Sequence, residues 1–261
     1  MRTCFLPLRS IIILGLTITL VCSVDAASTQ PAIVGSGSDS LAAFLHYPEK
    51  AKASREQAAV PFYCEIKSDG KPDHISTVDY KGKREFTDMV DHALRKCHFQ
   101  PARVDGKPVP VMIGGTVIFM FQGNTPAVVV SLSTADKEKT ARLGNYIQPQ
   151  MIGSDAEFRR KILKNRFDIL FHPGERPSAE VLAHVDANGN MTGTSLVAEA
   201  PPKGGWGTLL VKSMEGAKFI PALNNGSPVA GDYNLPFDFR RAHNPDADPF
   251  TGSHIKDDRD Q

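Results

Sequence analysis

The sequence predicts an α+β fold made of two tandem copies of one small module, and three observations support this prediction. The phrase F-x-P-A-x3-G-x-P-V occurs at residues 99–109 and again 120 positions later, at residues 219–229. Both times it follows alternating apolar residues, typical of strands, and then an apolar stripe at helical spacing. Because six residues recur at identical spacing, we infer a duplicated unit and expect the function to reside in it.

The first module is expected at residues 45–121, and it begins with a helix and a strand hairpin. Tyr47-Pro48 opens a short helical segment, since proline suits the first turn of a helix. Apolar side chains then alternate over Val60–Ile66, which is the period of a half-buried strand. Asp69-Gly70 supplies the hairpin turn, and residues 75–80 form the returning strand.

An amphipathic helix and a last strand complete the first module. The helix is predicted by one apolar stripe, made of Phe86, Met89, Val90, Ala93, Leu94 and Cys97. Pro101 ends this helix. The last strand runs from Val109 to Phe121, and Gly114-Gly115 is a candidate bulge within it.

The second module is expected at residues 154–240 and repeats this order. Ser154 is a good cap for a leading helix that runs to Phe167. Pro236 removes one N–H from the last strand, which is typical of a sheet edge. The hairpin strands, the amphipathic helix and the last strand are expected at residues 181–185, 191–197, 206–217 and 229–239.

The N-terminal 26 residues have the pattern of a secretory signal peptide. They combine a basic start, an apolar run and small residues before Ala26. The alternative is a retained membrane anchor, but the uncharged stretch from Ser10 to Val24 is shorter than the roughly 17–25 residues that a spanning helix needs. Three further segments complete the expected organisation: a flexible leader at residues 27–44, a linker at 122–153 and a polar tail at 241–261. Within the linker, Ala127–Leu132 either extends the preceding strand or forms a separate one.

Export would leave two cysteines in the mature chain, Cys64 and Cys97. Cys64 shares a strand face with Phe62 and Ile66, and Cys97 lies on the helix stripe, so both are expected at one interface. An even pair in an exported protein predicts a structural disulfide. Two buried free thiols are the alternative.

The first module resembles the C-terminal domain of the TonB family. The matching residues are Tyr47-Pro48-x-x-Ala51, Asp69-Gly70, Phe99-x-Pro101-Ala102 and Gly106-x-Pro108-Val109. The second copy matches mainly through its second half. The resemblance implies that each module is a three-stranded antiparallel sheet packed on a helix. It also implies a periplasmic domain that binds outer-membrane receptors by pairing with a short receptor segment at a sheet edge.

The last strand of the first copy is the expected partner-binding strand. Its side chains are apolar on both faces and it has no proline after Pro110, so the second module or a partner must cover it. The expected contact residues are Val117, Ile118, Phe119, Met120 and Phe121.

The resemblance leaves two roles open, because full-length transducers of this family need a permanent membrane helix and a long proline-rich spacer. Here only about 20 residues separate the apolar segment from Tyr47. Even fully extended, this stretch of chain spans at most about 70 Å. We therefore favour a periplasmic module that binds an envelope or outer-membrane protein by edge-strand pairing. A membrane-anchored energy transducer for siderophore-type transport is the alternative.

The sequence does not favour catalysis or cofactor binding. It contains no G-x-S-x-G, H-E-x-x-H or phosphate-binding glycine loop, and its eight histidines fit no metal-ligand spacing. The 30 Lys and Arg residues balance the 29 Asp and Glu residues, so nucleic acid is not an expected partner. We expect no enzyme, no metal and no cofactor, and a membrane contact only if the N-terminal segment is retained. An enzyme or metal protein on this scaffold is the third hypothesis, because a fold alone does not fix function.

Overall fold

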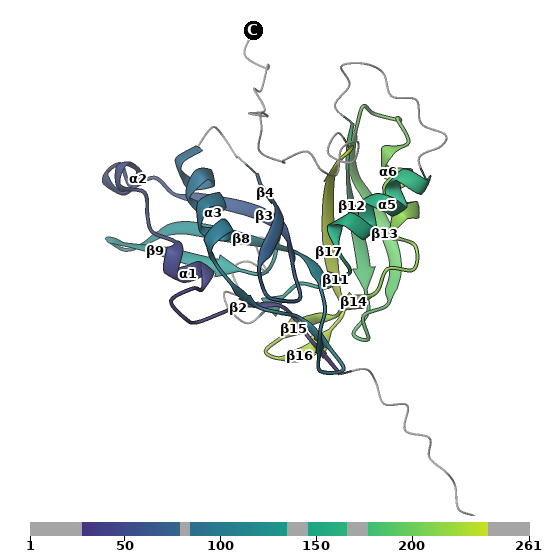
Figure 1. Cartoon of the computed structure of the whole chain (residues 1–261). Helices are drawn as coiled ribbons and strands as arrows, with labels where there is room; N and C mark the ends of the chain where they lie inside the picture. Colours follow the sequence, from purple (N-terminus) through teal and green to yellow (C-terminus); the bar gives the residue numbers. More distant parts are fainter. Residues whose placement is uncertain (1–27, 79–83, 135–145, 166–176, 240–261) are drawn as a thin grey trace, which may run out of the picture.

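The computed structural model describes residues 28–78, 84–134, 146–165 and 177–239. The expected signal peptide and polar tail lie outside these residues. The described chain is a mixed α+β structure with several small antiparallel sheets. Figure 1 shows one sheet with its helices on the left and a second sheet with its own helices on the right. None of the helices in the described ranges is both long and apolar enough to cross a bilayer.

The larger sheet is built around β3 (Ala58–Ile66) and β8 (Val111–Gln122), which pair antiparallel without a register shift. On its other side β3 pairs with β4 (Pro72–Thr77). The outer side of β8 pairs with two strands, β9 (Thr125–Ser131) and β11 (Gln150–Ile152). With the short β14 (Phe219–Ile220) next to β11, this sheet has six strands.

Three helices belong to this sheet: α1 (Leu41–Phe44), α2 (Glu49–Ala53) and α3 (Arg84–Lys96). The stripe predicted for α3 is confirmed, because Phe86, Val90, Ala93 and Leu94 are all fully buried in the core. In Figure 1, α1 and α3 lie over the same face of the sheet.

The expected bulge at Gly114-Gly115 is wrong, because β3 and β8 stay in register through both residues. Instead, the two glycines allow neighbouring side chains to lie close to the backbone of β8. A Cβ on Gly115 would lie 2.5 Å from the ring of Phe62, and one on Gly114 would lie 2.7 Å from the Gln148 amide. A side chain at Gly114 would therefore displace the Gln148 amide, and one at Gly115 would also press against the Ser131 carbonyl of β9 at 2.8 Å.

The flexible leader expected at residues 27–44 is also wrong for the residues that the structure describes. β1 (Thr29–Gln30) pairs with β6 (Arg103–Val104), and β2 (Ile33–Val34) pairs with β5 (Phe99–Gln100). Ala32 is fully buried. The segment is held by backbone pairing to residues about seventy positions away, which a local composition rich in Ser, Gly and Ala does not reveal.

The second sheet has the order β13-β12-β17. Its strands are β12 (Ser178–Val185), β13 (Met191–Ala200) and β17 (Gly231–Asp238). Helices α5 (Asp155–Asn165) and α6 (Trp206–Met214) pack beside one another, and α6 lies against β12 and β13. The expected helices and strands are thus present, although α6 ends three residues before Ala217.

The same set of pairings occurs in both halves of the chain. β3 lies between β4 and β8, as β12 lies between β13 and β17. The pairs β1–β6 and β2–β5 have counterparts in β10 (Tyr146–Ile147) with β15 (Ala222–Asn224) and in β11 with β14. β7 (Lys107–Pro108) and β16 (Ser227–Val229) then extend the two ribbons. The predicted linker, residues 122–153, therefore holds β9, β10 and β11. Of the segment Ala127–Leu132, all but Leu132 lies in the separate strand β9.

The predicted disulfide is wrong, since Cys64 and Cys97 are free thiols in the structure. Both are buried in the core of the larger sheet, as predicted, and the Cys97 Sγ donates to the Leu94 carbonyl at 3.5 Å. Burial raises the pKa of Cys64, and it raises the pKa of Cys97 to about 12. Both groups are therefore protonated core side chains at neutral pH.

Candidate functional site

β8 carries all five residues predicted to contact a partner, but it is not an open strand. β3 pairs with one of its sides, and β9 and β11 pair with the other. Val117 and Phe119 are fully buried, while Ile118, Met120 and Phe121 are half-buried. Along residues 117–121 the outer side of β8 is therefore covered by the chain's own β9, which is neither the second module nor a partner.

The strand β9 returns along β8 through a two-residue loop, Gly123-Asn124, which joins the paired residues Gln122 and Thr125. Gly123 has a φ of +62°, which suits the first position of a tight hairpin turn. A Gly-Asn pair between two apolar runs is a hairpin signal in the sequence. Gly123-Asn124 is therefore the sequence signal that indicates β9.

Arg55, just after α2, fixes the tip of this hairpin. Its guanidinium donates to the Gly123 carbonyl at 2.8 Å and to the Asn124 Oδ1 at 3.1 Å. The same group lies 4.6 Å from the centre of the Phe121 ring, a favourable cation–π distance. The hairpin is thus attached to the helical side of the sheet at its far end.

Tyr47, the first residue of the matching motif, packs against the ring of Phe121 and against two further aromatic rings of the core. Its ring centre lies 5.2 Å from that of Phe121, 5.7 Å from that of Phe119 and 6.0 Å from that of Phe86. Its hydroxyl donates to the Glu56 carbonyl. Such aromatic contacts stabilise a fold beyond their buried area alone, so the motif holds β8 and its hairpin in place.

The outer edge of β9 offers backbone groups for pairing. The Phe121 N–H donates to the Gln57 side chain at 3.4 Å, so it points away from β9. Because hydrogen bonding alternates along an antiparallel pair, the nitrogen of Pro126, which lies opposite Phe121, also points away from β8. The backbone groups of Val128 and Val130 then point the same way. Proline is tolerated at such an outward position because no ladder bond is lost.

The other long strands at sheet edges, β4, β13 and β17, have features that hinder strand addition. β4 has a register shift against β3 and a positive φ of 47° at His74. β13 has two register shifts against β12, and β17 contains Pro236. β9 pairs with β8 over seven residues without a shift and carries no charged side chain. Among the described edge strands longer than three residues, β9 is therefore the regular, uncharged one.

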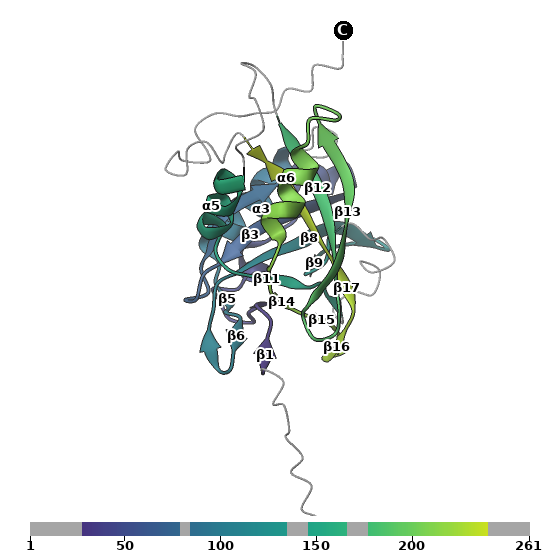
Figure 2. The same ribbon diagram turned by 90° about the vertical axis from the view of Figure 1, so that its right-hand side faces the viewer.

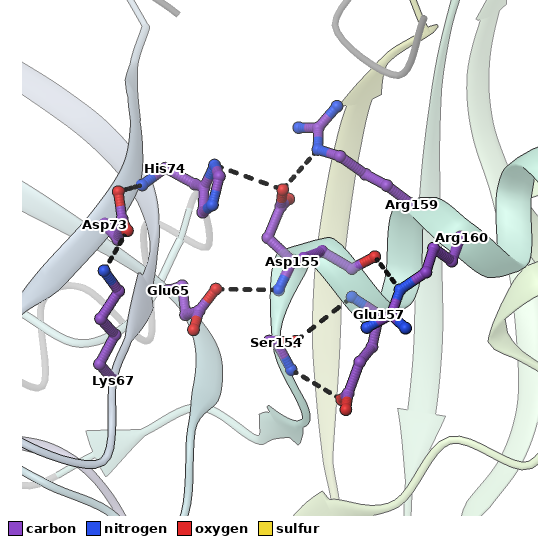
Figure 3. Close-up of polar contacts among 10 residues, drawn as sticks. Glu65, Lys67, Asp73, His74, Ser154, Asp155, Glu157, Arg159 and Arg160 are labelled. Atoms are coloured by element: carbon purple, nitrogen blue, oxygen red, sulfur yellow. Dashed lines mark hydrogen bonds and ion pairs between the residues drawn. The ribbon is translucent and has the colours of Figure 1, made fainter. Parts of the chain in front are cut away.

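Polar contacts join β3 and β4 of the larger sheet to the start of α5 (Figure 3). The Glu65 Oε2 accepts the backbone N–H of Asp155 at 3.0 Å. The Asp155 carboxylate lies 3.5 Å from the His74 Nδ1 and also bonds to Arg159. Ser154 and Glu157 form a reciprocal cap at the same helix start, which confirms Ser154 as the N-cap. Burial raises the pKa of Glu65.

A row of three side chains crosses the second sheet with the order of a hydrolase triad. The His184 Nδ1 lies 2.8 Å from the Asp232 Oδ1, and its Nε2 lies 2.9 Å from the Ser195 Oγ. However, the His184 and Asp232 side chains are 41% and 39% exposed on an open sheet face. Acyl transfer needs oxyanion donors and exclusion of water. We therefore assign this row to cross-strand stabilisation.

Residues 44–122 match the family model of the Gram-negative bacterial TonB protein C-terminal. The chain carries one TonB C-terminal domain. Domains of this family are non-catalytic, act in the periplasm and typically bind outer-membrane receptors. No curated protein and no solved structure matches the chain.

The match ends at Gln122, the last residue of β8. β9 thus follows immediately after the matched range and adds one strand to the domain's sheet. The second half of the chain, with β12, β13 and β17, also lies outside the match.

Proposed function

We propose that this chain is a non-catalytic periplasmic module that binds an envelope or outer-membrane protein by accepting an extended segment on the outer edge of β9. The observation that carries the proposal is the regular pairing of β9 directly after the TonB C-terminal domain. Strand addition gives affinity through backbone hydrogen bonds and specificity through alternate side chains.

The surroundings of β9 define the partner segment. Val128 and Val130 offer outward backbone donors and acceptors, whereas Pro126 offers only its carbonyl. Half-buried apolar side chains flank both faces of this edge, with Phe121 on one face and Ile118 and Val129 on the other. An extended segment with apolar residues on both faces fits these contacts, and each cross-strand pair contributes about 0.2–1 kcal/mol.

We also propose that residues 154–240 are a divergent second copy of the module, with a supporting role. The repeated phrase and the repeated order of pairings support this origin. Pro236 on β17 limits pairing in the second copy. Glu65, in the first sheet, bonds to the start of α5, which is consistent with a second half that fixes and shields the first.

The experiment is site-specific photocrosslinking in envelope extracts with the mature full chain. A photoreactive residue at Val129 is expected to capture an envelope protein. Val130→Pro is expected to abolish capture, because it removes an outward N–H but no bond to β8. Val130→Ala keeps this N–H and is expected to keep capture. A photoreactive residue at Val197, 55% exposed on the irregular edge of β13, is the matched control. Equal capture from Val197, or full capture by the proline variant, would refute the proposal.

Cell fractionation separates this role from that of an anchored transducer. The proposal expects processed protein in the soluble periplasmic fraction. Unprocessed protein in the inner membrane would instead favour energy transduction by the TonB C-terminal domain.

A further inference from the structure

A cleft of about 610 Å³ opens between the β-ribbons of the two halves. The ribbon of the first half comprises β1, β2, β5 and β6, and the ribbon of the second half contributes β10 and β15. Figure 2 shows both ribbons at the bottom of the molecule, next to each other. The volume lies within the roughly 300–1,000 Å³ of small-molecule sites.

Half-buried apolar side chains form the walls of the cleft. Ile33 and Pro101 come from the first half, and Ile147 and Leu223 come from the second. Pro101 belongs to the first repeated phrase, and Leu223 follows directly after the F-x-P-A of the second. The duplicated phrase therefore contributes to both walls of one site.

A buried side chain fixes the two walls relative to each other. The Gln150 amide accepts the backbone N–H of Ala32 at 2.7 Å and donates to the Ala32 carbonyl at 2.8 Å. Gln150 is only 1% exposed, so water does not compete with these bonds. A ligand thus meets preformed walls and avoids the entropic cost of ordering them.

The rim of the cleft is polar and carries a positive charge. Gln30, Gln100 and Arg103 line it and are exposed. The Arg103 Nη1 donates to the Gly106 carbonyl at 2.7 Å, and the remaining guanidinium N–H groups have no acceptor among the described residues. None of the lining residues that the structure describes is acidic. The charge of the rim therefore complements an anion.

We propose that this cleft binds a single-chain amphiphile with a carboxylate head, the chain against Ile33, Ile147 and Leu223 and the head at Arg103. Guanidinium groups bind carboxylates through paired hydrogen bonds, and apolar walls contribute roughly 25 cal/mol per Å² of chain that they bury. The site does not depend on strand addition at β9.

Titration calorimetry of the mature full chain with decanoate, kept below its micellar concentration, tests the proposal. Arg103→Ala is expected to weaken decanoate binding about tenfold, or about 1.4 kcal/mol, and to leave binding of decanol unchanged. Lys107→Ala, which removes an exposed cation of the same ribbon outside the cleft lining, is the matched control and should bind as wild type. Leu223→Glu, with its fold checked by circular dichroism, should bind neither ligand.

Anionic phospholipid vesicles distinguish the source of the amphiphile. Free decanoate should bind and should compete with any vesicle binding. Absence of decanoate binding at 1 mM (about −4 kcal/mol), equal binding by Arg103→Ala, or vesicle binding that decanoate does not displace would each overturn the proposal.

Discussion

Glu65 and Asp155 lie 90 positions apart, yet the Glu65 carboxylate accepts the backbone N–H of Asp155 at 3.0 Å. The bond joins β3 of the TonB C-terminal domain to the first turn of α5 (Figure 3). The first N–H groups of a helix have no partner within it, and a carboxylate is favoured there by the helix dipole. A single side chain thus stabilises the junction between the two halves.

This junction is expected to make stability depend on pH. Burial raises the pKa of Glu65 above its ordinary value of 4.5. The stability gained from its neutral form is therefore full below pH 4.5 and is lost as the pH rises through the raised value. Glu65→Gln cannot ionise but still accepts the Asp155 N–H. Its stability relative to wild type should therefore rise between pH 4 and pH 8, as measured by urea unfolding.

Glu65→Ala is the control for this effect. It cannot ionise either, so it should show the same pH dependence relative to wild type. It also leaves the buried Asp155 N–H without its acceptor, which should make it about 1–3 kcal/mol less stable than Glu65→Gln at either pH. If the glutamine and alanine variants lost equal stability at pH 8, the hydrogen bond to Asp155 would not be what Glu65 contributes.

Two glycines at equivalent turns test the proposed duplication. Gly70 and Gly189 have φ values of +89° and +81°, and an added Cβ would lie 2.2 Å from the Phe99 carbonyl oxygen and 2.1 Å from that of Phe219. Each alanine variant must therefore adopt a strained backbone and also displace a paired strand. We expect losses of more than about 2 kcal/mol for both in thermal unfolding.

The chain supplies matched controls at Gly106 and Gly226. They have φ values of +74° and +78°, but nothing lies within 4 Å of an added Cβ. Alanine there should cost only the backbone term of about 1–2 kcal/mol. If Gly189→Ala were as stable as Gly226→Ala or more stable, the proposed equivalence of the Gly70 and Gly189 turns would be contradicted.

Much of this fold could be predicted from local sequence patterns. The stripe from Phe86 to Leu94 defined α3, and the alternation through Phe62 defined β3, because each period reflects one buried face. The Ser154–Glu157 cap was also visible, since its chemistry lies within four residues.

The candidate site could not be predicted in the same way, because long-range pairing decides which strand is the edge. β8 is apolar on both faces, which predicts a strand that a partner covers, but β9 pairs with it instead. β11 pairs with the start of β8 through Met151 and Ile152, which lie about forty positions from their partners Met112 and Val111. The thiols of Cys64 and Cys97 show a related difference: the pattern placed both in one core, but a shared interface does not establish a bond.

Thiol reactivity tests the state of these cysteines. In a Cys4→Ser/Cys22→Ser variant, neither remaining thiol should react with Ellman's reagent at pH 8, because both are buried and the pKa of Cys97 is raised to about 12. Thiolates are the reactive form. After unfolding in guanidinium, two thiols should react. A denatured protein with no reactive thiol would instead reveal a disulfide.

Gln150→Ala should release the N-terminal segment of the described chain. The variant leaves the Ala32 N–H and carbonyl without partners in a buried place, where each unpaired group costs about 1–3 kcal/mol. Pairing of β1 and β2 is short, at two residues each, so the segment is expected to open locally before the core unfolds. Limited proteolysis should then cut near residues 28–38 in the variant and leave wild type intact. Gln100→Ala, on the exposed face of the same ribbon, should remain resistant. Equal cleavage of both variants would show that β5 pairing, and not the Gln150 amide, holds the segment.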